Sequence, residues 1–231
     1  MKNRSEHILE AAVSEFISSG RPITSELLFD RFEFGIKPAM IRWELNALSD
    51  DGFLFQRHPS GGRFPTNKAY RFFVERLMED ELEDTRAALG LAEEYEQHGT
   101  KSFVEEVSGL LGLLSVGYDE REKQIYESGL RSLLKRVEAD REDFMEIVND
   151  FELLPERIAR YRAWGNSEGA WPRVFIGESP FTKSEHLSVV ASSFDDGDGK
   201  FILLAVGPKR MDYRKSLRIM RSLSKCLNSN E

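Results

Sequence analysis

The sequence predicts an α+β protein whose helices come first and whose strands lie near the C-terminus. Apolar residues recur at helical spacing through residues 5–50. The middle of the chain, residues 79–160, is acidic, has helical spacing and is nearly free of proline. Short runs of β-branched and aliphatic residues then occur at 173–177, 187–191 and 201–206. We therefore expect a helical N-terminal domain, an acidic helical middle and a small C-terminal α/β domain of about three strands.

The charge of the chain is unevenly distributed. The whole chain of 231 residues has a net charge of −8. Residues 1–77 carry 11 Lys or Arg and 10 Asp or Glu, whereas residues 78–160 carry 10 and 22. Because local charge governs contact with phosphate, this acidity does not exclude a nucleic-acid partner for the N-terminal part.

Composition and motifs argue against several classes of protein. No apolar run is long enough to cross a bilayer and the N-terminus lacks a signal pattern, so we expect a cytoplasmic protein without membrane contact. Cys226 is the only cysteine and the histidines show no ligand spacing, which predicts neither a disulfide nor a zinc site. There is no P-loop and no G-x-S-x-G motif, so we expect neither an enzyme nor a cofactor.

Two helices are expected before residue 33. The first covers Ser5–Ser19, with Ser5 as its cap, and Pro22 prevents it from continuing. The second covers Ser25–Phe32, with Thr24 as its cap.

A third helix begins sharply at Pro38, whose fixed φ suits a first turn. Ile41, Leu45 and Leu48 recur at helical spacing, so this face points to a core. Helix, short turn with glycine and helix form the helix-turn-helix pattern. An Arg and an Asn on the small, partly apolar outer face suit the major groove of DNA. The candidate DNA contacts on this recognition helix are Lys37, Ala39, Met40, Arg42, Trp43 and Asn46.

The segment after the third helix predicts a wing, that is, a β-hairpin beside a helix-turn-helix. Residues 53–57 alternate like an edge strand, 58–63 form a basic loop with two glycines, and 64–66 return. Arg57 and Arg63 are expected to reach phosphate or the minor groove. An ordinary hairpin with solvated arginines is the alternative, and the preceding helix-turn-helix favours the wing. The candidate DNA contacts here are Arg57, His58, Ser60, Gly61, Gly62, Arg63 and, on the next helix, Lys68.

The rest of the chain is expected to form two further parts. Residues 79–124 are predicted as a helical linker with candidate dimerisation helices, and its patch Leu110–Leu114 needs a core or a dimer partner. Residues 125–231 are predicted to hold the strands and a last helix, Tyr213–Leu227. Asp195–Gly199 predicts a hairpin turn, which is favoured over a calcium loop because the twelve-residue ligand spacing is absent.

Three stretches of the sequence carry a family resemblance. They are Ala39–Arg42 with the residues that follow it, His58–Thr66 continued by Ala69–Arg71, and Ile176–Glu178 together with Gly207–Tyr213. Together they resemble HrcA, the family of heat-inducible transcription repressors of bacterial chaperone operons. The stretch His58–Thr66 is the most specific of the three.

The resemblance implies a winged-helix DNA-binding domain over residues 1–78 and a truncated GAF-like domain over 125–231. It implies a homodimer on double-stranded DNA with an inverted-repeat operator called CIRCE, and repression modulated by the GroE chaperonin. The family usually has Thr and Asn where this chain has Met40 and Trp43, so we expect a different operator sequence. The chain is also shorter than its relatives in the middle, so the first GAF-like strands and the inserted dimerisation domain are expected to be absent.

Two alternative functions compete with repression. The winged helix could dock a protein instead of DNA, because exposed Met40 and Trp43 would suit a protein partner. The C-terminal domain could also sense a metabolite and act on genes other than heat-shock genes. A basic surface around Arg42, Arg57, Arg63 and Lys68 would favour DNA, and an acidic or apolar one would favour a protein partner.

Overall fold

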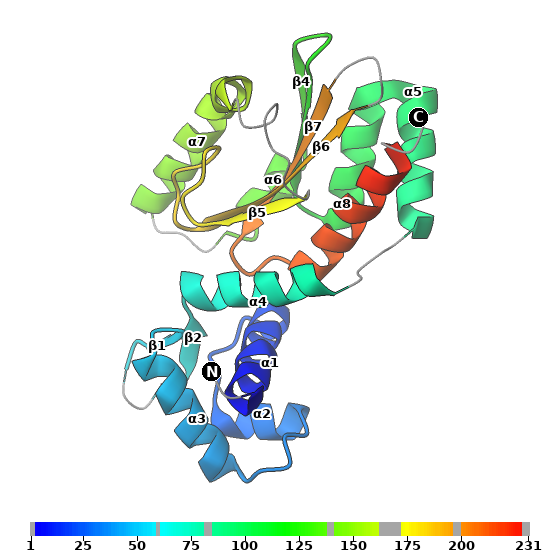
Figure 1. The fold of residues 1–231 in the computed structure, drawn as a ribbon. Helices are drawn as coiled ribbons and strands as arrows, with labels where there is room; N and C mark the ends of the chain where they lie inside the picture. Colours follow the sequence, from blue (N-terminus) through cyan, green and yellow to red (C-terminus); the bar gives the residue numbers. More distant parts are fainter. Residues whose placement is uncertain are drawn as a thin grey trace. The chain divides into compact units, whose positions relative to one another are not determined.

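The computed structural model describes residues 3–58, 61–80, 85–137, 141–161, 172–195 and 200–227 (Figure 1). These residues form a mixed α+β structure, as the sequence predicts, and its strands make two antiparallel sheets. The chain divides into two compact units, residues 1–79 and 80–231. The predicted division into three parts is therefore wrong, because the segment 79–124 contributes a helix and a strand to the core of the second unit.

The first unit consists of helices and one two-stranded sheet. Its elements are, in order, α1 (Asn3–Ser19), α2 (Ser25–Arg31), α3 (Pro38–Asp50), β1 (Leu54–Gln56), β2 (Arg63–Pro65) and α4 (Asn67–Glu79). The hydroxyl of Thr24 accepts a hydrogen bond from the backbone N–H of Leu27 at 3.1 Å, which confirms the predicted cap of α2. Pro38 occupies the first turn of α3, also as predicted.

The inner face of α3 forms part of the core of the first unit. Ile41, Leu45 and Leu48 are buried, which confirms the predicted apolar face. Glu44 is buried on the same helix, and its carboxylate accepts a hydrogen bond from the Ser5 hydroxyl at 2.8 Å. The prediction that Ser5 caps α1 is therefore wrong: Ser5 lies inside the helix and supplies the donor that a buried carboxylate needs.

The two-stranded sheet is tied to the segment between α1 and α2. β1 and β2 pair in an antiparallel register in which Phe55 lies opposite Phe64. Ile23 and Arg63 exchange both backbone hydrogen bonds, each at 2.8 Å. The free edge of β2 is therefore paired with a residue about 40 positions earlier in the chain. The entropy cost of closing so long a loop is modest, because it grows only slowly with the number of residues.

The second unit is built on a five-stranded antiparallel sheet with the order β4-β3-β7-β6-β5. Its elements are α5 (Thr85–Leu111), β3 (Leu114–Asp119), β4 (Gln124–Ser128), α6 (Leu130–Leu134), α7 (Arg141–Arg160), β5 (Arg173–Ile176), β6 (Leu187–Asp195), β7 (Lys200–Pro208) and α8 (Tyr213–Leu227). The bounds of α8 agree with the predicted last helix. The prediction of about three strands, with the first strands absent, is wrong because β3 and β4 complete the sheet.

The two strands that sequence reasoning missed have weak local signals. β3 follows α5 so closely that its first residue, Leu114, belongs to the same leucine-rich run as the end of the helix. β4 lies at the edge of the sheet, and none of its residues is buried. The turn between the strands is charged and lacks an Asn-Gly signal; Lys123 in this turn has a φ of 53°. A polar edge strand after such a turn resembles an acidic helix in sequence.

Helices cover both faces of the five-stranded sheet (Figure 1). α5 and α8 pack on one face, and Gly117 in β3 allows the close approach, because a Cβ there would lie 2.6 Å from the side chain of Val104 in α5. The other face carries the core that β-strand residues such as Val116 form with Leu133 of α6 and Ile147 of α7. Since side chains alternate along a strand, Val116 and Gly117 serve opposite faces.

The hairpin predicted around Asp195–Gly199 is confirmed by the pairing of its strands. β6 and β7 are in register from Leu187 opposite Pro208 to Asp195 opposite Lys200. Residues 196–199, on which the calcium-loop alternative depends, lie outside the described residues.

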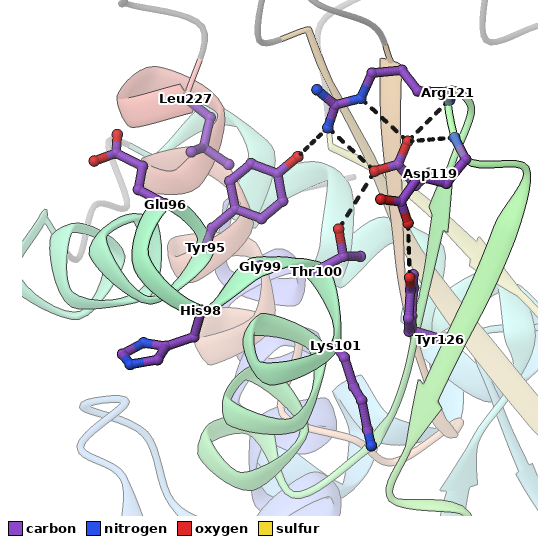
Figure 2. Close-up of a pocket in the computed structure, with 11 residues that line it drawn as sticks. Tyr95, Glu96, His98, Gly99, Thr100, Lys101, Asp119, Arg121, Tyr126 and Leu227 are labelled. Atoms are coloured by element: carbon purple, nitrogen blue, oxygen red, sulfur yellow. Dashed lines mark hydrogen bonds and ion pairs between the residues drawn. The ribbon is translucent and has the colours of Figure 1, made fainter.

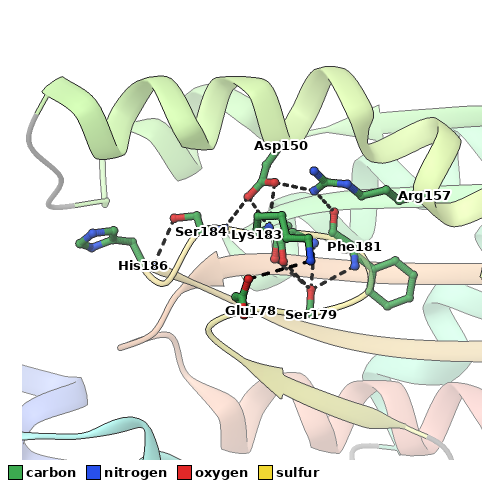
Figure 3. A network of polar contacts seen from close by, with 9 residues as sticks. Asp150, Arg157, Glu178, Ser179, Phe181, Lys183, Ser184 and His186 are labelled. Carbon is green, nitrogen blue, oxygen red and sulfur yellow. Dashed lines mark hydrogen bonds and ion pairs between the residues drawn. The ribbon is translucent and has the colours of Figure 1, made fainter.

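An ion pair between buried Asp150 and half-buried Arg157 attaches the connection between β5 and β6 to α7 (Figure 3). The carboxylate of Asp150 is buried and accepts the backbone N–H groups of Lys183 and Ser184, both at 2.8 Å. Arg157, two turns along α7, contacts Asp150 at 2.5 Å and donates to the carbonyl of Phe181 at 2.8 Å. Because the carboxylate is compensated by several donors, the pair holds this loop in one conformation.

We expect Asp150→Ala to lower the free energy of unfolding by about 3–5 kcal/mol, because the half-buried Arg157 loses its counter-charge and the loop N–H groups lose their acceptor. Urea unfolding followed by circular dichroism measures this change. Glu152→Ala, on the exposed side of the same helix, is the matched control and should change the free energy by less than about 0.5 kcal/mol. Equal effects of the two substitutions would contradict the role of the ion pair.

Candidate nucleic-acid interface

The outer face of α3 is exposed and partly apolar. Met40 is 45% exposed and Trp43 is 60% exposed, although both are large apolar side chains. Arg42 lies between them in sequence and is exposed as well. Every candidate contact predicted on this helix is exposed, namely Lys37, Ala39, Met40, Arg42, Trp43 and Asn46.

Arg42 lies close enough to two other charged groups to lower the pKa of each. The pKa of Glu26 in α2 is lowered, mainly by a hydrogen bond from its own backbone N–H, and Arg42 adds a favourable charge. Burial lowers the pKa of the Arg63 guanidinium, and the positive charge of Arg42 lowers it further. Arg42 therefore adds positive charge between α2 and the β1–β2 hairpin.

The side chain of Arg63 points into the protein. Arg63 is only 6% exposed. Its Nε donates to the hydroxyl oxygen of Ser49 at 3.2 Å, and its Nη2 donates to the amide oxygen of Asn46. The prediction that Arg63 reaches phosphate or the minor groove is wrong, because its guanidinium is occupied by α3. An arginine in a loop with two glycines looks solvated in sequence, and only the fold shows this direction.

Arg57 is the exposed arginine of the hairpin. Its guanidinium lies over the ring of Phe64, 4.9 Å from the ring centroid, and Phe64 stacks on Phe55 with 5.4 Å between centroids. A cation over an aromatic face keeps its outer side in water. The hairpin thus presents one positioned positive charge on its surface.

Two hydrogen bonds join described residues on either side of the loop between β1 and β2. The backbone N–H of Gly61 donates to the carbonyl of His58 at 2.9 Å, and the side-chain amide of Gln56 donates to the carbonyl of Gly61 at 2.7 Å. His58 and Gly61 are exposed. Ser60, another candidate contact, lies outside the described residues.

Gly62 lets the hairpin approach the segment before α2. A Cβ at this position would lie 2.6 Å from the Cβ of Pro22 and 2.9 Å from its backbone carbonyl carbon. Both distances are shorter than real Cβ contacts, so only glycine fits without a shift of the backbone. Gly62 thereby permits the two hydrogen bonds between Ile23 and Arg63.

Lys68 is engaged at the C-terminal end of α3. Its Nζ donates to the carbonyl of Asp51 at 2.7 Å and lies 4.2 Å from the ring centroid of Phe53. A cation at this end satisfies a helix carbonyl and favours the helix dipole. Lys68 thus lies at the opposite end of α3 from Lys37 and Met40.

We expect Gly62→Ala to lower the free energy of unfolding by about 1–3 kcal/mol, because the added methyl group overpacks against Pro22. Thermal or urea unfolding measures the change. Gly61→Ala is the control, since its new Cβ would meet the carbonyl oxygen of His58 at 3.3 Å, a milder contact. A Gly62→Ala variant as stable as Gly61→Ala would contradict the close approach.

The second unit contains a polar cavity of about 490 Å³ beside the β3–β4 hairpin (Figure 2). Asp119 is buried in its wall and accepts hydrogen bonds from the backbone N–H of Arg121 at 2.9 Å and from its guanidinium at 3.2 Å. Arg121 also donates to the hydroxyl of Tyr95 at 3.2 Å. Gly99, with a φ of 78°, interrupts α5 at this cavity. Sequence reasoning missed these residues because it missed β3 and β4.

The carboxyl group of Asp119 stabilises the fold only when it is ionised. Burial raises its pKa, but the hydrogen bonds from Arg121 and from the backbone N–H groups outweigh burial, and the pKa lies below the ordinary value of 3.8. Because the folded-state pKa is lower than the unfolded-state pKa, this stabilisation is present above about pH 4 and is lost as the pH falls through the folded-state value.

Between about pH 5 and about pH 2.5, we expect the native chain to lose more free energy of unfolding than the Asp119→Asn variant, which has no proton to bind at this site. Urea unfolding at a series of pH values measures the two slopes. Glu120→Gln, which removes the neighbouring exposed carboxylate, should keep the native slope. Parallel slopes for the native chain and Asp119→Asn would contradict the lowered pKa.

Two further kinds of site are not found in the described part of the chain. None of its helices has the length and hydropathy needed to span a membrane. Nor do three or more His, Cys, Asp or Glu side chains of these residues come together as they would around a metal ion.

Comparison with known protein families decides which family the chain resembles. The family model described as the HrcA protein C-terminal domain matches residues 63–217, which is more than half of the chain. The chain belongs to the HrcA family. This confirms the resemblance that the wing motif and the C-terminal motifs carry.

Individual HrcA proteins match parts of the chain. The heat-inducible transcription repressor HrcA of Roseiflexus castenholzii is 44% identical over 79 residues, which cover 34% of this chain and 22% of that protein. The protein of the same name from Nodularia spumigena is 29% identical over 170 residues, which cover 66% of this chain and 45% of that protein. The chain thus spans less than half the length of these HrcA relatives.

A solved structure has the same fold. A crystal structure described as that of a hypothetical protein superposes with a TM-score of 0.75 at 17% sequence identity, and the match covers 100% of both chains. At this identity the likeness shows the fold alone.

Proposed function

We propose that this chain is a sequence-specific, DNA-binding transcriptional repressor of the HrcA kind. The observation that carries the proposal is the exposed outer face of α3, which presents Arg42 and Asn46 beside a hairpin that presents Arg57. These are the side chains that contact base edges and phosphates in DNA complexes. The name of the HrcA relatives, heat-inducible transcription repressor, supports the same function.

In this proposal the first unit is a winged helix. α2 and α3 form the helix-turn-helix, and β1 with β2 form the wing. α3 has 13 residues, so it is about 20 Å long and fits the major groove. Arg42 then contacts a base or a phosphate from the first half of the helix, and Arg57 contacts the DNA backbone or the minor groove from the wing.

The remaining parts of the proposal follow from membership in the family. The second unit acts as a GAF-like domain, and two copies of the chain bind an inverted-repeat operator of the CIRCE type. Two-fold symmetry requires half-sites separated by whole turns of DNA, about 34–36 Å each. The GroE chaperonin is then the partner that modulates repression.

A protein-docking module is the second candidate function, and one observation favours it. Met40 and Trp43 are both exposed on α3, and large exposed apolar side chains are typical of interface centres. If α3 lies in the major groove of DNA, the same two side chains would contact thymine methyl groups, as apolar side chains do there. The positive charges of Arg42 and Arg57 beside them favour DNA.

Selection from a random pool of DNA duplexes tests the proposal. We expect the native chain to enrich a palindromic motif, and Arg42→Ala to relax the preference at one position of each half-site if Arg42 contacts a base. Arg57→Ala should weaken binding to all sequences alike and reduce the slope of log affinity against log salt by about one. A pool without any enriched motif would rule out sequence-specific binding and leave the protein-docking module.

A further inference from the structure

Arg63 connects the hairpin to the outer part of α3. Its backbone is held by both hydrogen bonds to Ile23, and its buried guanidinium donates to Ser49 and Asn46, which lie one turn apart on α3. The hydroxyl of Ser49 is itself fixed, because it donates to the carbonyl of Leu45 at 3.0 Å. Arg63 is thus held at its backbone and at its guanidinium.

The contact with Arg63 determines which way the amide of Asn46 is turned. A guanidinium has only donors, so the amide group must direct its oxygen toward Arg63. The NH₂ group then lies on the other side of the amide carbon, on a residue that is exposed at the surface of α3. Asn46 is exposed and its acceptor is engaged by a charged partner, so the NH₂ group is the part of the amide that can bind another molecule.

We propose that Arg63 is a positioning residue that fixes the amide of Asn46 as a donor, and that Asn46 thereby selects guanine in the operator. The inference rests on the proposed DNA-binding function. An asparagine that recognises adenine needs its oxygen for the adenine N6 donor and its nitrogen for N7. Guanine offers two acceptors, N7 and O6, at the same edge, and these match an outward NH₂ group.

This positioning role also explains why Arg63 is buried while Arg57, in the same wing, is exposed. A phosphate contact would require an exposed guanidinium, as at Arg57, whereas Arg63 is 6% exposed. The wing therefore contributes in two ways: Arg57 contributes charge, and Arg63 contributes the orientation of a side chain on the recognition helix.

Duplex selection with four variants tests the inference. Asn46→Ala and Arg63→Met should lose the same guanine preference, on the order of tenfold, and the double variant should lose no more than either single variant. Arg63→Lys should keep part of the preference, because it retains one donor group. Arg63→Met should leave the salt slope of the native chain unchanged, in contrast to the expected effect of Arg57→Ala.

Asn46→Asp keeps an acceptor for Arg63 and replaces the NH₂ donor with a charged acceptor, so it tests the inference even if Arg63→Met does not fold. We expect this variant to prefer cytosine at the operator position where the native chain prefers guanine, because the N4 amino group of cytosine donates to a carboxylate. Circular dichroism and the melting temperature show whether each variant is folded.

The outcomes separate the inference from the proposed function. A native motif with guanine preference that persists in Asn46→Asp or Arg63→Met would overturn the positioning role and leave the DNA-binding function intact. A salt slope reduced by about one in Arg63→Met would instead assign Arg63 to a phosphate and also overturn the inference. A native chain that enriches no motif would overturn both.

Discussion

The exchange of two backbone hydrogen bonds between Ile23 and Arg63 is the constraint on which the first unit depends. It draws the hairpin against the segment before α2, and this approach is possible only because residue 62 has no side chain. With its backbone fixed there, Arg63 directs its guanidinium onto α3. This one backbone pairing thus sets the position of the hairpin, explains why residue 62 is a glycine and brings Arg63 onto α3.

The two faces of α3 differ: the inner face supports the fold, and the outer face is the one that we propose to contact DNA. The inner face packs Ile41, Leu45 and Leu48 into the core, and these positions determine whether the unit folds. Met40 and Trp43, where the chain departs from the usual pattern of the HrcA family, are both on the exposed face. Substitutions there do not disturb the core, so in the proposed function the DNA sequence that α3 contacts can diverge while the fold is retained.

The second unit forms a five-stranded sheet in a chain that spans less than half the length of the HrcA relatives it matches. β3 and β4 extend the sheet beyond β7, and helices pack on both of its faces. Two buried carboxylates then fix the loops around it: Asp150 binds the β5–β6 connection, and Asp119 binds the start of the β3–β4 turn. Each is compensated by an arginine and by backbone N–H groups, as buried charge requires.

The sequence by itself determined the helices of the first unit, the hairpin, the last helix and the family, because caps, Pro38, helical spacing and the wing motif are local signals. Only the tertiary structure decided that β4 is a strand, since a polar edge strand has no alternation to reveal it. It also decided the direction of Arg63, because the partners of that side chain, Asn46 and Ser49, are 17 and 14 residues away in sequence. The neighbouring sequence does not determine whether an arginine side chain is exposed or buried. That depends on which hydrogen-bond acceptors the fold places near its guanidinium.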